Sequence, residues 1–263
     1  MKKIYLAALT LAMTACVSND DLNPVDNYGY IDVNVSNDPV MVTRAEGVPN
    51  WIITATKDGS DYTEYTFKSG HNRVPSGTYV ITAKSHDDEA TANTTNSWGE
   101  AFYSGISQTV TIIAGGTETA TIPCEKAKNS RVKTIFSLKG EQFKDYRIEL
   151  SQNITSPTTF NKTLTITKEN SNNLAYFSAG TVSFTFYYKY GSSTDEKNIQ
   201  SSITCVAGTE HHINITSDDN GTITLNISFD NTFTNGGDKT ITFNAATGEK
   251  VSETDTTPTT PSN

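Results

Sequence analysis

Residues 211–229 read HHINITSDDNGTITLNISF, a stretch in which apolar and polar side chains alternate on both sides of a turn. Ile213 and Ile215 alternate with Asn and Thr, and the apolar positions 223, 225, 227 and 229 continue the pattern with the same period. The intervening Asp-Asp-Asn-Gly supplies residues that favour tight turns. A period of two is that of a strand with one buried face. The stretch therefore predicts an antiparallel β-hairpin.

The same alternation recurs along most of the chain, with turn residues every 8–15 positions. In the first half we expect strands at 30–35, 51–57, 62–68, 78–84, 108–113 and 118–124. In the second half we expect them at 131–138, 146–151, 163–168, 181–190, 201–206, 211–216, 222–229 and 239–245. The only helical candidate is GEQFKDY at 140–146. Short, regularly spaced strands predict an all-β protein of two tandem antiparallel β-sandwiches, at 28–128 and 129–246, followed by a disordered polar tail at 247–263.

The two halves also resemble each other in sequence. SQTVTIIAGGTETATI at 107–122 parallels QSSITCVAGTEHHINI at 200–215, each a strand, a Gly-Thr-Glu turn and a returning strand. PSGTYVITAK at 75–84 likewise parallels SAGTVSFTFYYK at 178–189. These echoes favour an internal duplication.

Composition and charge narrow the class of protein. The chain has 263 residues and a net charge of −9, and it lacks a basic stripe, so nucleic acid is excluded as a partner. Only 19% of the residues are charged, while twelve Tyr and eleven Phe supply aromatic bulk. This composition is typical of an extracellular β protein.

The N-terminus reads as an export signal that ends at a cysteine. MKK precedes an apolar run of 12 residues from Ile4 to Ala15, which is shorter than the ~20 residues of a membrane-spanning helix. We therefore expect a signal peptide at 1–15. Met13-Thr14-Ala15-Cys16 resembles the bacterial lipobox, in which the cysteine becomes the acylated first residue of the mature chain. Acyl chains there would anchor the protein to a membrane; the alternative is a plain signal peptide with an incidental cysteine.

The residues after Cys16 form an acidic tether at 16–27 that contains Asp20, Asp21 and Asp26. Such residues resemble the surface-export signal of Bacteroides-type lipoproteins, which implies an outer-membrane, surface-exposed location. A linker that is merely acidic is the alternative.

The two remaining cysteines lie on apolar faces of predicted strands. Ala120 and Ile122 share a face with Cys124, and Ile203 shares one with Cys205. We expect both thiols to be buried in different sandwiches, where a free cysteine behaves as a small hydrophobic residue. A disulfide between them is the alternative.

Four short motifs stand out in the chain: the Pro-x-Gly-Thr-Tyr turn at 75–79, the aromatic before Gly105, the Ala-Gly-Gly-Thr hairpin, and Cys-x-x-Ala-x-Asn-x-x-Val from Cys124 to Val132. Together they resemble a family of Bacteroides-type surface lipoproteins whose domain has no known function. The resemblance spans roughly Tyr28 to Phe229. It is similar in plan to fimbrillins, the pilus subunits of the same bacteria. The resemblance implies transthyretin/immunoglobulin-like sandwiches and a structural or adhesive role.

Catalytic and cofactor motifs are missing from the sequence. His211 and His212 are adjacent in a predicted strand, so one faces inward and one outward, and they do not share a metal. His86 opens HDDE, a charged loop that matches neither an EF-hand nor a zinc site. No nucleophile elbow, Walker loop or dinucleotide fingerprint occurs. We predict no enzyme activity, no cofactor and no metal site.

Loop aromatics offer a possible binding surface. Trp98 follows a long polar stretch, and Phe102 and Tyr103 follow closely. Exposed rings of this kind bind sugars, so a glycan-binding lipoprotein is the alternative function. The competing interpretation is that Trp98 anchors its loop to the sandwich.

Two further sites concern processing. Arg44-Ala45 follows the first predicted strand, and fimbrillins polymerise after an Arg-directed protease removes an N-terminal strand, whose place a neighbour's strand then takes. Thr256, in Asp255-Thr256-Thr257, resembles a Bacteroides-type O-glycosylation acceptor.

We therefore expect a non-catalytic, fimbrillin-like surface lipoprotein that contacts the membrane through its lipid, and other fimbrial subunits or surface glycans through its sandwiches.

Overall fold

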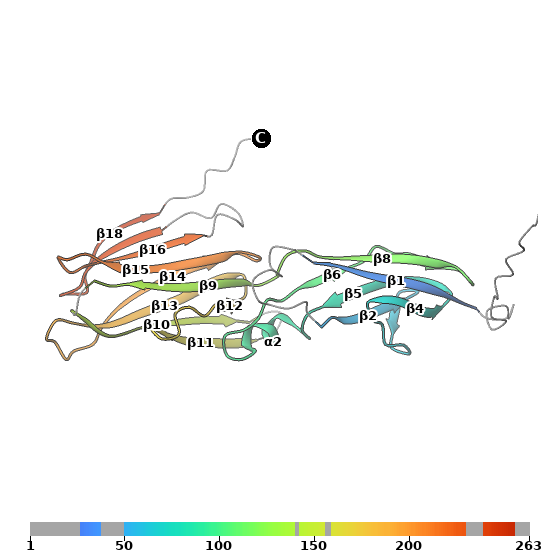
Figure 1. Ribbon diagram of the computed structural model, residues 1–263, viewed down its shortest axis with the longest axis horizontal. Helices are drawn as coiled ribbons and strands as arrows, with labels where there is room; N and C mark the ends of the chain where they lie inside the picture. Colours follow the sequence, from blue (N-terminus) through green and yellow to red (C-terminus); the bar gives the residue numbers. More distant parts are fainter. Residues whose placement is uncertain (1–26, 38–49, 140–141, 156–158, 230–238, 256–263) are drawn as a thin grey trace, which may run out of the picture.

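The computed structural model describes residues 27–37, 50–139, 142–155, 159–229 and 239–255. Strands dominate these residues, and the two halves of the chain follow one another along the long axis of the molecule (Figure 1). The all-β sandwich prediction is confirmed. Within the described ranges, no helix has the length and apolar character that a membrane crossing requires.

The first half consists of two sheets, with strand orders β4-β1-β8 and β3-β2-β5-β6; β7 also pairs with β5. Its elements are β1 (Tyr28–Asn37), β2 (Ile52–Lys57), β3 (Ser60–Tyr62), β4 (Gly70–Pro75), β5 (Gly77–Lys84), α2 (Glu89–Thr94), β6 (Ser104–Ile106), β7 (Val110–Ile112) and β8 (Thr117–Cys124).

The second half also consists of two sheets, with strand orders β11-β10-β13-β14 and β12-β9-β15-β16-β17-β18. Its strands are β9 (Ser130–Ser137), β10 (Phe143–Ile154), β11 (Phe160–Thr167), β12 (Ala175–Phe177), β13 (Gly180–Tyr190), β14 (Lys197–Cys205), β15 (Glu210–Ser217), β16 (Thr222–Phe229), β17 (Lys239–Asn244) and β18 (Lys250–Asp255).

The two halves correspond strand for strand over most of their length. The sheet β4-β1-β8 matches β12-β9-β15, and β3-β2-β5 with β7 matches β11-β10-β13-β14. The sequence echo at 107–122 and 200–215 falls on the matching strands β7, β8 and β14, β15. The second half adds β16, β17 and β18 beyond β15. The topology thus supports the predicted internal duplication.

Both halves also contain a parallel strand pair, which corrects the expectation of purely antiparallel sheets. The first strand of each half runs parallel to a late strand, β1 to β8 and β9 to β15. Parallel neighbours require a long connection, and here the rest of each sandwich provides it. Alternation along a strand does not encode the direction of its neighbour, so the parallel pairing could not be predicted from the pattern.

Each half buries its own apolar cluster. Ile31 and Tyr79 are fully buried in the first, and Phe186 and Tyr188 in the second. Cys124 belongs to the first cluster and Cys205 to the second, and both are free, so the predicted placement of the two thiols is confirmed. Burial raises the pKa of Cys124, and it raises the pKa of Cys205 to about 11, so both thiols stay protonated near neutral pH.

Two element predictions were wrong. The helix expected at 140–146 is not formed by its residues from Phe143 onward, which begin β10: Phe143 pairs with Tyr190, and their ring centroids lie 5.1 Å apart. Residues 140–141 lie outside the described ranges. The strand expected at 62–68 ends at Tyr62, and the following aromatics pack edge-on, with ring centroids of Tyr65 and Phe67 5.3 Å apart. Tertiary packing overrides the local pattern in both places.

The predicted disorder of the tail at 247–263 is also wrong in part, since Lys250–Asp255 form the edge strand β18. Its apolar Val251 is 66% exposed, so main-chain pairing with β17 and ion pairs hold the strand. Glu253 lies 2.7 Å from the ammonium groups of both Lys239 and Lys250. An edge strand can form without an apolar face, so the alternation of apolar residues did not predict β18. Residues 256–263 lie outside the described ranges.

Candidate functional site

A cluster of buried polar side chains lies where the two halves of the chain meet. We call it the joint. It comprises the helix α2 with the loop that follows to Tyr103, Asn129 on the connection between the halves, Lys162 on β11, and β12 with Ser178. The candidate binding residues Trp98, Phe102 and Tyr103 all fall in this region.

The helix α2 begins the joint because its first turn is capped. The Asp88 carboxylate accepts a hydrogen bond from the backbone N–H of Thr91 at 2.7 Å, and this bond lowers the pKa of Asp88. The HDDE segment, which matches no metal-binding motif, therefore contains the cap of this helix. His86 beside it lies 3.2 Å from Glu100 through Nε2 and 3.0 Å from the Ser85 hydroxyl through Nδ1.

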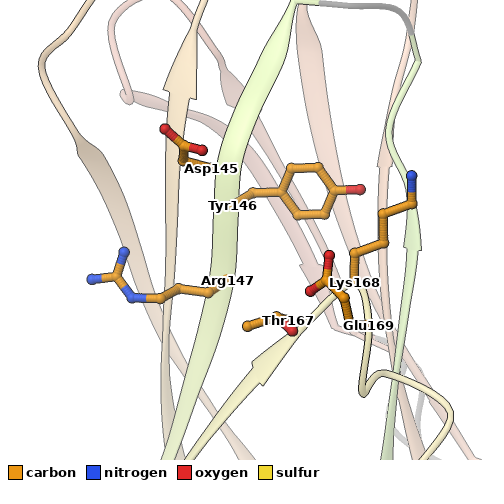
Figure 2. A pocket seen from close by; sticks show the side chains of 6 residues that line it. All are labelled: Asp145, Tyr146, Arg147, Thr167, Lys168 and Glu169. Carbon is orange, nitrogen blue, oxygen red and sulfur yellow. The ribbon is translucent and has the colours of Figure 1, made fainter.

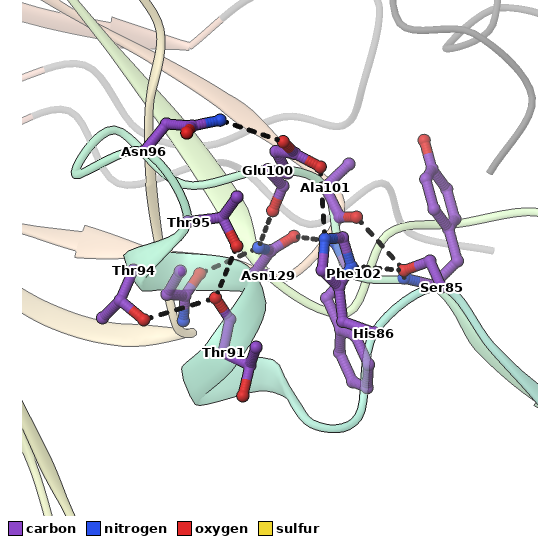
Figure 3. A network of polar contacts seen from close by, with 12 residues as sticks. Ser85, His86, Thr91, Thr94, Thr95, Asn96, Glu100, Ala101, Phe102 and Asn129 are labelled. Carbon is purple, nitrogen blue, oxygen red and sulfur yellow. Dashed lines mark hydrogen bonds and ion pairs between the residues drawn. The ribbon is translucent and has the colours of Figure 1, made fainter. Parts of the chain in front are cut away.

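Asn129 ties this loop to the start of the second half (Figure 3). Its amide nitrogen donates to the side-chain oxygen of Asn93 and to the backbone oxygen of Glu100, both at 2.8 Å. Its oxygen accepts from the backbone N–H of Phe102 at 2.9 Å. Asn93 in turn donates to the Ser178 hydroxyl at 2.9 Å. Because Asn129 and Asn93 are 1% and 0% exposed, these bonds replace water as their partners.

Lys162 lies at the centre of the joint with its side chain buried. Its ammonium group donates to the backbone oxygens of Asn93 at 2.6 Å and of Trp98 and Tyr176 at 2.8 Å. The same nitrogen lies 4.8 Å from the ring centroid of Phe177. One amine thus satisfies three carbonyl groups from both halves of the chain.

The protonation of Lys162 is set by two opposing effects. Burial lowers the pKa of Lys162 to about 7, since removing an ammonium group from water disfavours its charged form. No carboxylate of the described residues lies within ion-pair distance of it, so only the carbonyl dipoles and the Phe177 ring favour the charge. The geometry with three acceptors fits the ammonium form, which has three N–H donors.

Aromatic side chains cross the joint in both directions. Trp98, from the first half, is half-buried and packs against the apolar cluster of the second half. Tyr176, from the second half, is buried in the cluster of the first, and its N–H donates to the Trp98 oxygen at 2.8 Å. This exchange joins the two cores.

This placement bears on the alternative of a sugar platform at Trp98, Phe102 and Tyr103. Phe102 and Tyr103 are each 8% exposed, which leaves no open ring face on either residue. The Trp98 backbone oxygen is used by Lys162 and Tyr176, and its ring packs on the second core. Trp98 thus has the position of an anchor, as the competing interpretation expected, and the glycan hypothesis has no exposed ring here to support it.

His211 and His212 belong to a second buried polar cluster, at the start of β15. His211 is fully buried and His212 partly exposed, as the alternation predicts. Glu210 accepts from Arg131 at 2.7 Å and lies 2.7 Å from His212. Burial, with the neighbouring His212, lowers the pKa of His211 to about 4, so His211 is neutral near pH 7. Within the described ranges, no group of three or more metal-binding side chains occurs.

Sequence reasoning missed Lys162 and Asn129, although Lys162 left a sign. Lys162, Leu164 and Ile166 share one face of β11, and all three are buried. A lysine on the apolar face of a strand indicates that its amine is buried and is hydrogen-bonded by the protein itself. Asn129 is the asparagine of the Cys-x-x-Ala-x-Asn-x-x-Val motif, but it lies on a connection without periodicity, so the sequence assigned it no role.

The other predicted site residues, Cys16, Arg44, Ala45 and Thr256, lie outside the described residues.

The chain is an all-β protein of two sandwiches. The polar side chains of its joint form their hydrogen bonds with groups of the protein itself, many of them backbone groups. A model of a domain of unknown function (DUF4493) matches residues 52–245, and the chain belongs to that family. None of the curated proteins compared with the chain matches it.

The solved structures that are similar to the chain include two that are described as proposed cell adhesion proteins. The one from Bacteroides fragilis is 12% identical with a TM-score of 0.41, over 76% of this chain and 96% of its own. The one from Bacteroides thetaiotaomicron is 13% identical with a TM-score of 0.39, over 72% and 92%. At these values the likeness transfers neither activity nor partner to this chain.

Proposed function

We propose that this protein is a non-catalytic, surface-exposed lipoprotein that serves as a structural or adhesive subunit of the fimbrillin kind. Cys16 would carry the lipid and residues 16–27 the acidic tether to the outer membrane. The described sandwiches would form the stalk. The joint supports a mechanical role, because its buried polar groups bind both halves together rather than facing solvent.

The observation that carries this proposal is the position of β1. It lies between β4, to which it is antiparallel, and β8, to which it is parallel. Ile31 and Val33 are 0% and 2% exposed and belong to the apolar cluster of the first half. Because β1 lies in the middle of its sheet, it forms backbone hydrogen bonds with a neighbour on each side. Without a strand at this position, the backbone groups of β4 and β8 that face it would have no partner.

Removal of β1 would create an acceptor for another strand. Cleavage after Arg44 would separate β1, with the lipid tether, from the rest of the chain. The facing edges of β4 and β8 would then offer unpaired backbone groups on both sides of a groove, with apolar pockets where Ile31 and Val33 were. A strand of a second copy could fill it by β-augmentation, which satisfies the backbone and the pockets together.

The test is the N-terminus and the intact mass of the protein recovered from the cells that naturally produce it. Strand exchange requires a population that begins at Ala45 without lipid and migrates as a polymer. Arg44→Ala should keep the lipidated Cys16 and remain monomeric, whereas Arg147→Ala, which changes an arginine of the second half, should behave as the native protein does. A chain that starts only at lipidated Cys16 in native cells would contradict the assembly mechanism.

A further inference from the structure

A second polar cluster lies at the beginning of β10 and the end of β11, away from the joint. It borders an open cavity of about 450 Å³, which is within the size range of small-ligand sites. We call it the end pocket (Figure 2). Its lining residues are Asp145, Tyr146, Arg147, Thr167, Lys168 and Glu169.

A β-bulge shapes the end pocket. The pairing of β10 with β13 shifts register between Lys144 and Arg147, and Asp145 within the bulge has a φ of 48°. A left-handed conformation is costly for a residue other than glycine, and bulges commonly redirect side chains next to binding sites. Figure 2 shows the result: Tyr146 projects to the side of β10 that Lys168 and Glu169 occupy, and Asp145 and Arg147 project to the other.

The side chains on the outer side of β10 are already paired. Arg147 donates to Glu149 at 3.3 Å and to Glu196 at 3.2 Å, and its guanidinium carbon lies 4.1 Å from the ring centroid of Tyr187. Asp145 accepts from Lys189 at 2.9 Å. These groups stabilise the bulge and have little capacity left for a ligand.

The side chains on the pocket side are different. Within the described part of the chain, neither the hydroxyl of Tyr146 nor the ammonium of Lys168 has a hydrogen-bond partner. Glu169 accepts from Thr167, which lowers the pKa of Glu169 and keeps it ionised near neutral pH. The Tyr146 ring is partly buried and packs against Phe136, with ring centroids 5.1 Å apart, so only its exposed part faces the pocket. The pocket thus combines part of an aromatic ring, a cationic donor and an anionic acceptor.

We propose that the end pocket binds a neutral hexopyranose unit of a glycan. A sugar ring has an apolar face that stacks on an aromatic ring, and hydroxyl groups that both donate and accept. Tyr146 supplies the ring, Lys168 donates, and Glu169 accepts. Because Lys168 and Glu169 carry opposite charges, the pocket has no net charge to favour an acidic or a basic sugar. This site does not depend on cleavage at Arg44.

The test is an array of neutral and charged glycans probed with the uncleaved, full-length protein in mild detergent. We expect binding to glycans that end in a neutral hexose, reduced about tenfold in Tyr146→Ala and in Lys168→Met. Lys144→Met, which changes an exposed lysine of the same strand, should bind as the native protein does. Circular dichroism of each variant checks that the fold is retained.

Three results would overturn the site: no glycan bound above background, binding to charged glycans alone, or binding that neither pocket variant reduces. A soluble acidic peptide that competes better than the free sugar would equally exclude a sugar site. Because the probe is the uncleaved chain, these outcomes do not bear on strand exchange.

Discussion

Two lysines on or beside β11 show how differently the joint and the end pocket use the same side chain. Lys162 is 5% exposed and its ammonium donates to three backbone oxygens. Lys168, six positions on, is exposed and has no hydrogen-bond partner among the described residues. The two residues lie at different ends of one strand, so the difference comes from their surroundings.

The difference separates structural from binding clusters. In the joint, the side chains of Asn93, Asn129 and Lys162 are satisfied by groups of the protein, so a ligand has nothing left to bind. In the end pocket, a bulge presents a hydroxyl and an ammonium group that remain available. Buried and satisfied polar groups specify one arrangement of the chain, whereas exposed and unsatisfied groups are available for recognition.

The largest effect is expected from Lys162→Met, which removes the amine and retains most of the volume. The backbone oxygens of Asn93, Trp98 and Tyr176 would lose a donor inside the protein. We expect the free energy of unfolding to fall by about 2–4 kcal/mol, measured in urea, because buried unsatisfied carbonyls are costly. The matched control is Lys168→Met, for which we expect no change beyond about 0.5 kcal/mol. Equal effects of both substitutions would remove the distinction between the two regions.

Asn129→Ala should have the next largest effect. The buried N–H of Phe102 and the Glu100 oxygen would lose their partner, and so would Asn93. We expect a loss of about 1–3 kcal/mol in the same urea assay. Asn170→Ala, in the turn after β11, is the control, since its bonds to Thr165 and Thr167 lie nearer to solvent. A loss at Asn170 as large as at Asn129 would show that burial is not what matters.

Trp98→Ala tests the anchor against the sugar platform. The ring is half-buried against the second apolar cluster, so we expect a loss of about 1–3 kcal/mol of unfolding free energy. Glycan binding by the end pocket should be unchanged under conditions in which the variant stays folded. A variant with native stability that loses glycan binding would instead assign the ligand to Trp98.

The smallest effect concerns the edge strand β18 and depends on pH. The hydrogen bonds of Glu253 with Lys239 and Lys250 lower its pKa to about 2. A carboxylate whose pKa is lower in the folded chain stabilises it above its ordinary pKa near 4.5, and this contribution is lost as the pH falls toward 2. Hydrogen exchange should therefore show β18 amides opening more readily at pH 2 than at pH 5. In Glu253→Gln, the β18 amides should exchange faster than in the native protein at pH 5, and their exchange should change less between pH 5 and pH 2. The same change with pH in both proteins would contradict a role of Glu253 in holding β18.

Alternation in the sequence was sufficient to predict the sandwiches, most strand positions and the burial of Cys124 and Cys205 in separate cores. Alternation failed to predict structure where a strand is held by pairing with a strand far away in the sequence. The parallel pair of β1 and β8 joins segments separated by the whole first sandwich. β18 depends on main-chain pairing, which leaves no trace in side-chain pattern.

The candidate sites were harder to predict for the same reason. The aromatic run at Trp98, Phe102 and Tyr103 was recognised, but whether a loop aromatic faces solvent or a neighbouring core depends on the second half of the chain. Lys162 was visible as a charge on an apolar face, yet its acceptors are backbone oxygens, which every residue has. The bulge at Asp145 lies in the segment 140–146 that the sequence pattern presents as a helical candidate, so the pattern gave no indication of a bulged strand.

The most direct test of the central claim, that the joint makes the two sandwiches one unit, is differential scanning calorimetry of the full chain. We expect one cooperative transition whose calorimetric and van't Hoff enthalpies agree, because the two cores share Trp98, Tyr176 and Lys162. Lys162→Met should broaden or split that transition. Two separate transitions in the native protein would contradict the claim, since the halves would then unfold independently.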